Sequence, residues 1–336
     1  MADMLALLKG EQLVEISEDF DYLRATEDFV GLKLFPLAKT ENMKLAIYNL
    51  VDGADVPVMA FVHALDTEAR IGDRPDAQEL KFELFLIKEK LNQGEAIRKK
   101  IKDLGMGNSE RAVLEAIYND ASNLISRVLT RMEVMACELL STGRITVKEN
   151  NVDKTVDFGL KAEHYITVAD WATASHDIIG DLVKVKNRSK GKIVRALVSS
   201  DVMQKMLANE QFAKVAGSQS PVQYVTAEWV KSYISALLGI EFVVVDGTYK
   251  KSARDTEEFN FFKDGTVCFL ETTDALGNTF VTSSPEEDYG IANYTNGLVS
   301  VTQYTTNDPA GIWTKASAIA FPCPKNVNQM WICKVL

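Results

Sequence analysis

The chain has 336 residues, of which 46% are hydrophobic and 25% are charged. This composition is ordinary for a folded protein with room for two compact units, and it excludes disorder over most of the chain. The formal net charge of -10 repels polyanions, which argues against a protein that grips nucleic acid or an acidic membrane surface.

Nothing in the chain marks it for export or for binding a metal ion. Residues 1 to 9 lack the basic start and long apolar stretch of a signal peptide, and no apolar run reaches the roughly 18 residues that a membrane span needs. The three histidines show no metal-binding spacing, and the four cysteines lie too far apart for a metal knuckle. We therefore expect a protein made in the cytosol, with reduced core cysteines and no metal or cofactor.

Residues 1–42 form an acidic leader. Acidic residues such as Glu15 and Glu18 are interleaved with single apolar residues such as Ile16 and Phe20. Such a segment can form a short helix, but it lacks the apolar density for a core of its own. We expect it to lie along another surface.

Residues 43–91 have the pattern of a long hairpin of β-strands. Strands are expected over 45–50, 56–62 and 79–86. The last of these alternates strictly, which places one set of apolar side chains on a single face of a half-buried strand. That set is Leu80, Phe82, Leu84 and Leu86.

The tip of this hairpin is polar. Residues 67–77 carry Arg70, Asp73 and Arg74, with Gly72 and Pro75 as strand breakers. An isolated two-stranded ribbon is marginal in water, so its apolar face needs a covering surface.

The segment 109–141 predicts one unusually long helix. Apolar residues recur every three or four positions with neither proline nor glycine between them, and Gly143 follows the end. Such a helix would span on the order of 50 Å at its rise per residue. A rod of that length is expected to organise a domain around itself.

The remainder of the chain alternates between predicted strands and helices. Two strands at 144–147 and 155–158 flank a turn, and the later elements are helix 170–185, strand 192–198, helices 201–215 and 227–238, and strand 241–245. From about residue 280 the sequence returns to strands, at 297–302 and 330–336. We expect the chain to re-enter its first unit there.

Two segments suggest enzyme motifs, and neither is complete. The stretch Phe242–Thr248 ends in Asp-Gly-Thr, as in haloacid-dehalogenase-type phosphatases, but Val244 occupies the place of the nucleophilic aspartate. The glycines at 105 and 107 lack the third glycine of a dinucleotide loop, and no Gly-Lys-Ser/Thr follows them. A cytosolic α/β enzyme with an unrecognised active site stays open as an alternative.

Several phrases recur in order in one family of shell proteins. They are Asn260–Leu270, Asn307–Ala310 and Ala318–Pro324, with 45–53 and 57–65 upstream. Together they resemble the lambda-like phage major capsid protein E family. The resemblance implies an α+β protein with the tailed-phage major capsid fold.

The resemblance also implies how the chain is divided. An N-terminal arm would cover 1–42 and an extended β-hairpin loop 43–91. A peripheral domain with a long spine helix would cover 92–165, an axial α/β domain 166–285, and strands returning to the peripheral domain 286–336.

The function implied is structural, with no catalytic or cofactor-binding residues. Copies would self-assemble into pentamers and hexamers of an icosahedral shell around packaged double-stranded DNA, built in the host cytoplasm. Scaffolding, portal and decoration proteins are the candidate partners, without sequence-specific DNA binding or membrane contact. The predicted inter-subunit contacts lie on the hairpin, where an adjacent copy would bury the apolar stripe and meet the charged tip: Arg70, Asp73, Arg74, Leu80, Phe82 and Leu84.

Overall fold

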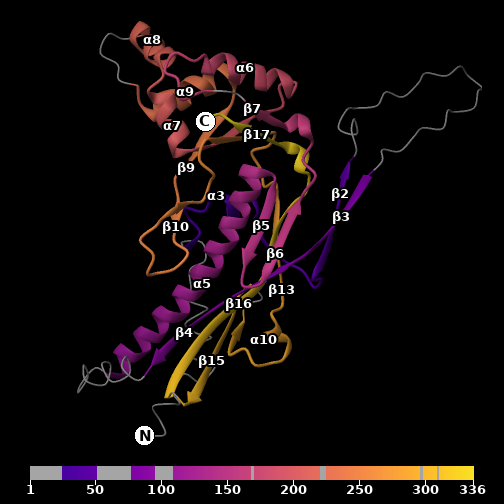
Figure 1. The fold of residues 1–336 in the computed structure, drawn as a ribbon, viewed down its shortest axis with the longest axis vertical. Coiled ribbons are helices and arrows are strands. Elements are labelled where there is room, and N and C mark those ends of the chain that lie inside the picture. The colour runs from indigo at the N-terminus through magenta and orange to yellow at the C-terminus, as the bar shows by residue number, and fades with distance from the viewer. Residues whose placement is uncertain are drawn as a thin grey trace, which may run out of the picture.

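The computed structural model describes residues 25–50, 77–94, 109–167, 170–219, 225–295, 298–308 and 310–336. The molecule is elongated, and helix α5 (Ser109–Thr142) runs obliquely along it (Figure 1). The helix has 34 residues, which corresponds to about 51 Å. The predicted long helix is confirmed.

Helix α5 is amphipathic in the way the apolar spacing predicted. Within the part whose side chains are described, the predicted stripe is buried: Ala121, Leu124, Val128, Met132, Met135 and Leu139. Gly143 ends the helix in the left-handed region at φ 70°, and its N–H donates to the Leu139 carbonyl at 2.8 Å.

A six-stranded sheet extends along α5. Its order is β1-β13-β16-β15-β14, and β4 also pairs with β16. The strands are β1 (Leu37–Lys39), β4 (Phe85–Gly94), β13 (Gly277–Thr282), β14 (Tyr294–Thr295), β15 (Ser300–Asn307) and β16 (Ala310–Pro324). Strands β4 and β16 are antiparallel, from Phe85 opposite Ala320 to Gly94 opposite Gly311.

A second sheet lies at the other end of the molecule. Its order is β7-β17-β12-β8-β9, with strands β7 (Tyr165–Thr167), β8 (Arg195–Ser199), β9 (Glu241–Val245), β12 (Thr266–Leu270) and β17 (Met330–Lys334). Four helices gather there (Figure 1): α6 (Ile178–Arg188), α7 (Ser200–Leu207), α8 (Glu210–Gln219) and α9 (Ala227–Leu238).

The central strand β12 joins the two hydrophobic cores. Val267 and Phe269 belong to the core beneath the four helices, whereas Cys268 and Leu270 belong to the core shared with α5. Alternate side chains of a strand point to opposite faces, so every residue of β12 is buried.

Three two-stranded hairpins complete the described chain. They are β2 (Lys44–Leu50) with β3 (Ala77–Glu83), β5 (Arg144–Glu149) with β6 (Val152–Asp157), and β10 (Thr248–Tyr249) with β11 (Phe259–Asn260). The short helical turns are α3 (Val30–Leu34), α10 (Pro285–Asp288), η1 (Ala162–His164) and η2 (Val327–Gln329). The predicted strand 56–62 and the hairpin tip before residue 77 lie outside the described residues.

The predicted strand 79–86 is wrong at its end, because the chain changes sheets at Leu84. Strand β3 pairs with β2 up to Glu83, and β4 pairs with β16 from Phe85 onward. Leu84 and Phe85 both turn inward, so the alternation slips by one residue. Leu86 is consequently 43% exposed and does not share the face of Phe82.

Two of the predicted helices have different bounds. The helix predicted over 170–185 begins at Ile178, where the Asp177 side chain accepts from the Gly180 N–H. The helix predicted over 201–215 is two helices, because buried Asn209 interrupts it. Its side chain accepts from the Gln211 N–H and donates to the His176 carbonyl, so Asn209 starts α8 as a cap.

Two strands lie in the opposite sheet from the predicted one. Strand β17 was expected to return to the first unit, but it lies between β7 and β12 of the second sheet. Strand β13 falls in the segment predicted as axial, yet it pairs with β1 and β16 of the six-stranded sheet. These pairings depend on partners far away in sequence.

The slip at Leu84 predicts a contrast between two substitutions. Phe82→Ala should lower the unfolding free energy of the subunit by about 3–5 kcal/mol, because it empties a packed core position. Leu86→Ala should change it by less than about 0.5 kcal/mol, because that side chain is substantially exposed. Urea unfolding of both variants measures the difference, and equal losses would show that the two residues share one buried face.

Candidate functional site

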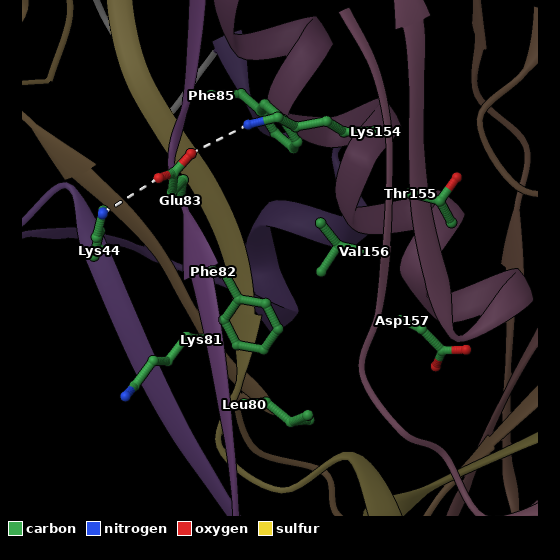
Figure 2. Close-up of a pocket in the computed structure, with 10 residues that line it drawn as sticks. All are labelled: Lys44, Leu80, Lys81, Phe82, Glu83, Phe85, Lys154, Thr155, Val156 and Asp157. Atoms are coloured by element: carbon green, nitrogen blue, oxygen red, sulfur yellow. Dashed lines mark hydrogen bonds and ion pairs between the residues drawn. The ribbon is translucent and has the colours of Figure 1, made fainter.

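The base of the β2–β3 hairpin meets the β5–β6 hairpin at an open groove of about 540 Å³. We call it the hairpin-base groove (Figure 2). It is lined by Lys44, Leu80, Lys81, Phe82, Glu83, Phe85, Lys154, Thr155, Val156 and Asp157. Figure 2 shows Phe82 and Val156 side by side, with Glu83 between the two lysines Lys44 and Lys154.

A cluster of four phenylalanines anchors the groove to the core. The Phe82 ring lies 5.1 Å from that of Phe158 and 6.0 Å from that of Phe321, measured between centroids. Phe321 also contacts Phe85 at 5.4 Å and stacks on Phe158 at 5.8 Å. Aromatic pairs at these separations add to the stabilisation from burial. The cluster therefore holds the hairpin where it leaves the body.

Glu83 is the electrostatic centre of the groove. It pairs with Lys154 of β6 at 3.1 Å and with Lys44 of β2 at 3.5 Å. The hydrogen bond and charge of Lys154, followed by those of Lys44, lower the pKa of the Glu83 carboxyl. All three side chains are more than half exposed, so the pairs add little stability. The pairs link β3 to both β2 and β6 at the edge of the groove.

The structure brings together only part of the predicted contact set. Leu80, Phe82 and Leu84 all lie at the hairpin base, whereas Arg70, Asp73 and Arg74 fall outside the described residues. Phe82 and Leu84 are buried in the protein's own core, so the expectation that an adjacent copy must cover them is wrong. Leu80 is only partly buried and keeps some surface for a second molecule.

The second organising contact was not predicted. Residues Gly31 and Leu32 of α3 donate their backbone N–H groups to the two carboxylate oxygens of Glu133, each at 2.7 Å. Cys137 donates to the same carboxylate at 3.2 Å. A Cβ at Gly31 would lie 2.8 Å from Glu133 Oε2 and from Ala136 Cβ, so only glycine permits this approach.

This contact shows which surface the end of the leader lies along, while residues 1–24 lie outside the described residues. Residues 30–35 pack on the chain's own α5, with Leu32, Leu34 and Phe35 buried. The signal in the sequence was one acidic residue inside the apolar run Met132–Cys137. A buried carboxylate needs hydrogen-bond donors, but the sequence does not show which donors they are.

One of the histidines and the aspartate of the Asp-Gly-Thr motif have structural partners. His164 stacks on Trp331 and contacts the Met330 carbonyl, and Asp246 accepts from the Ser200 hydroxyl at 2.8 Å. In the part of the chain that is described, no three histidine, cysteine or acidic residues are grouped to hold a metal ion. None of the described helices is long and apolar enough to cross a membrane.

Comparison with known proteins favours the structural interpretation. The sequence profile of the family described as phage major capsid protein E matches residues 28–335. The chain belongs to this family. It is thus a structural protein of a bacteriophage virion, whose copies form the icosahedral shell of the capsid. The phage capsid family gives no support to the enzymatic alternative.

Solved structures confirm the fold of this capsid protein. The putative capsid protein of a prophage of Escherichia coli CFT073 has a TM-score of 0.57 at 14% identity, over 96% of this chain and 95% of that one. A phage-related protein from Bordetella bronchiseptica RB50 has a TM-score of 0.54 at 12% identity, over 94% and 97%. These two likenesses show that the chain has the predicted tailed-phage capsid fold. No curated protein matches the sequence.

The Glu133 contact predicts a dependence of stability on both substitution and pH. Glu133→Ala should lower the unfolding free energy by about 2–4 kcal/mol, because two amide groups lose their acceptor in the core. It should also open residues 25–42 to limited proteolysis.

The pH dependence follows from the direction of the Glu133 pKa shift. Burial raises this pKa, and the hydrogen bonds from Gly31, Cys137 and Leu32 only partly offset the rise. The folded chain therefore holds the proton to higher pH than the unfolded chain, and the stability from this proton is lost as the pH rises through the folded pKa. Glu133→Gln, which cannot titrate, should lack this component in urea unfolding at a series of pH values. If the stability of Glu133→Gln varied with pH in the same way as that of the wild-type chain, Glu133 would not be the source of this component.

Proposed function

We propose that this capsid protein assembles into pentamers and hexamers, and that its extended hairpin lies across an adjacent subunit. The observation that supports this is the position of the β2–β3 ribbon, which projects from the body (Figure 1). In the described part of the chain β2 and β3 pair only with each other. A two-stranded ribbon gains stability when another surface covers it.

The proposal divides the predicted contact residues into two roles. Phe82 and Leu84 anchor the ribbon in its own subunit, where both are buried. Leu80 and the tip residues Arg70, Asp73 and Arg74 are the proposed contacts to the neighbour. A ribbon that is anchored at its base can repeat one contact around rings of five or six copies.

The remaining partners follow from the role in a shell. Double-stranded DNA enclosed by the shell need not be gripped by it, which is compatible with the net charge of -10. Assembly in the host cytoplasm with scaffolding, portal and decoration proteins belongs to the same proposal.

The assembly of the purified full-length chain tests the proposal. Sedimentation and electron microscopy should show shells, or rings of five and six copies. A monomer or a small fixed oligomer under all assembly conditions would contradict it.

Deleting residues 67–77 should leave a folded subunit that does not form shells, because the tip contacts would be lost. Circular dichroism and thermal unfolding check that the deleted chain still folds. The triple variant Arg70→Ala, Asp73→Ala, Arg74→Ala, which keeps the hairpin length, should weaken assembly in the same direction. Normal shells from both variants would remove the tip from the contact.

A further inference from the structure

A small rigid projection on the six-stranded sheet carries exposed apolar side chains. We call residues 283–292, which include α10, the α10 knob. Tyr289 is 81% exposed and Ile291 57% exposed, the highest values among the large hydrophobic side chains that the structure describes. Large apolar side chains presented together at a surface are typical of a docking site.

The knob is held in one conformation by its backbone. The end of the knob turns back toward α10, where the Glu286 carbonyl accepts from the N–H groups of Ile291 and Ala292 at 2.9 and 3.0 Å. Ser284 caps α10 by accepting from the Glu287 N–H, and Gly290 has a φ of 65°. A surface that is already ordered loses little conformational entropy on binding.

A buried ion pair fixes the knob to the sheet. The Glu286 carboxylate accepts from Lys315 Nζ at 2.5 Å and from the Ser317 hydroxyl at 2.7 Å. Burial alone would raise the pKa of Glu286, but these two hydrogen bonds outweigh it and lower the pKa to about 2. Glu286 is therefore ionised and neutralised by Lys315 at neutral pH.

The knob has two other acidic residues, Glu287 and Asp288. Asp288 accepts from the Ser283 hydroxyl at 2.7 Å, and Glu287 from the Ser300 hydroxyl at 3.5 Å. Neither carboxylate forms an ion pair with a cation in the described part of the chain. The exposed side of the knob is thus apolar and negative.

The hairpin-base groove has the complementary character. Leu80, Phe82 and Val156 provide apolar lining, and the side chains of Lys44, Lys81 and Lys154 stand at its edge, each more than half exposed. Arg144 pairs with Asp157, Lys81 with Glu79 at 3.1 Å, and Glu83 with both Lys44 and Lys154, which leaves these groups with one net positive charge. This contrasts with the acidic chain as a whole.

We propose that the α10 knob of one subunit docks into the hairpin-base groove of a second copy. This inference rests on the proposed function and names the surface of the neighbour that meets the hairpin. Tyr289 and Ile291 cover the exposed parts of Leu80 and Val156, while Glu287 and Asp288 approach the lysines. In Figure 1 α10 lies beside the lower part of the six-stranded sheet, whereas the β2–β3 ribbon, a separate two-stranded sheet, projects from the body above it.

A disulfide trap tests the contact directly. The native cysteines are buried, so engineered surface cysteines react with little background. Ile291→Cys combined with Lys81→Cys should give a ladder of linked subunits when assembled shells are mildly oxidised and run on a non-reducing gel. The matched control combines Ile291→Cys with Leu237→Cys, an exposed position on α9, and should stay monomeric on the gel.

A second measurement does not depend on cysteine chemistry. Tyr289→Ala should leave the unfolding midpoint unchanged, because the side chain is exposed, and should raise the concentration needed for shell assembly about tenfold. Leu237→Ala is the matched control and should leave assembly unchanged.

The outcomes separate the two proposals. If the wild-type chain forms shells, but the Lys81 pair gives no ladder and Tyr289→Ala assembles normally, the knob contact is refuted and the proposed function stands. If the wild-type chain forms no shells or rings, the proposed function fails and this inference fails with it.

Discussion

Contact between four phenylalanines at the base of the hairpin is the interaction on which the rest of the structure depends. Phe82, Phe85, Phe158 and Phe321 come from three distant parts of the chain and meet in one cluster. A projecting ribbon cannot keep a direction without a fixed base. The cluster supplies it by joining the hairpin to the six-stranded sheet and to the segment that follows β6.

Two carboxylates hold segments of the chain together in different ways. Glu133 is buried on α5 and holds the backbone of α3 through short hydrogen bonds. Glu83 is exposed and links β2 and β3 to β6 through two lysines. A buried carboxylate is costly to leave without donors, so the first contact is rigid, whereas water and salt weaken the second. The attachment of the arm therefore depends less on solvent and salt than the Glu83 ion pairs do.

The structure changes the interpretation of the apolar stripe predicted over residues 80–86. Phe82 and Leu84 do not need an adjacent subunit to cover them, because their own chain buries them. Surface available to a second copy is left at Leu80, at the lysines of the groove and at the α10 knob. Assembly would then join subunits in which Phe82 and Leu84 are already packed.

The sequence by itself determined the local elements and the family. The spacing of apolar residues defined α5, and the cap at Thr226 with Gly239 defined α9, because these signals act within a few residues. Only the tertiary structure decided that the strand breaks at Leu84, that β17 enters the second sheet and that Glu133 binds the arm. Each of these depends on a partner far away in the chain, and no local pattern records which partner an inward side chain or a strand edge will meet.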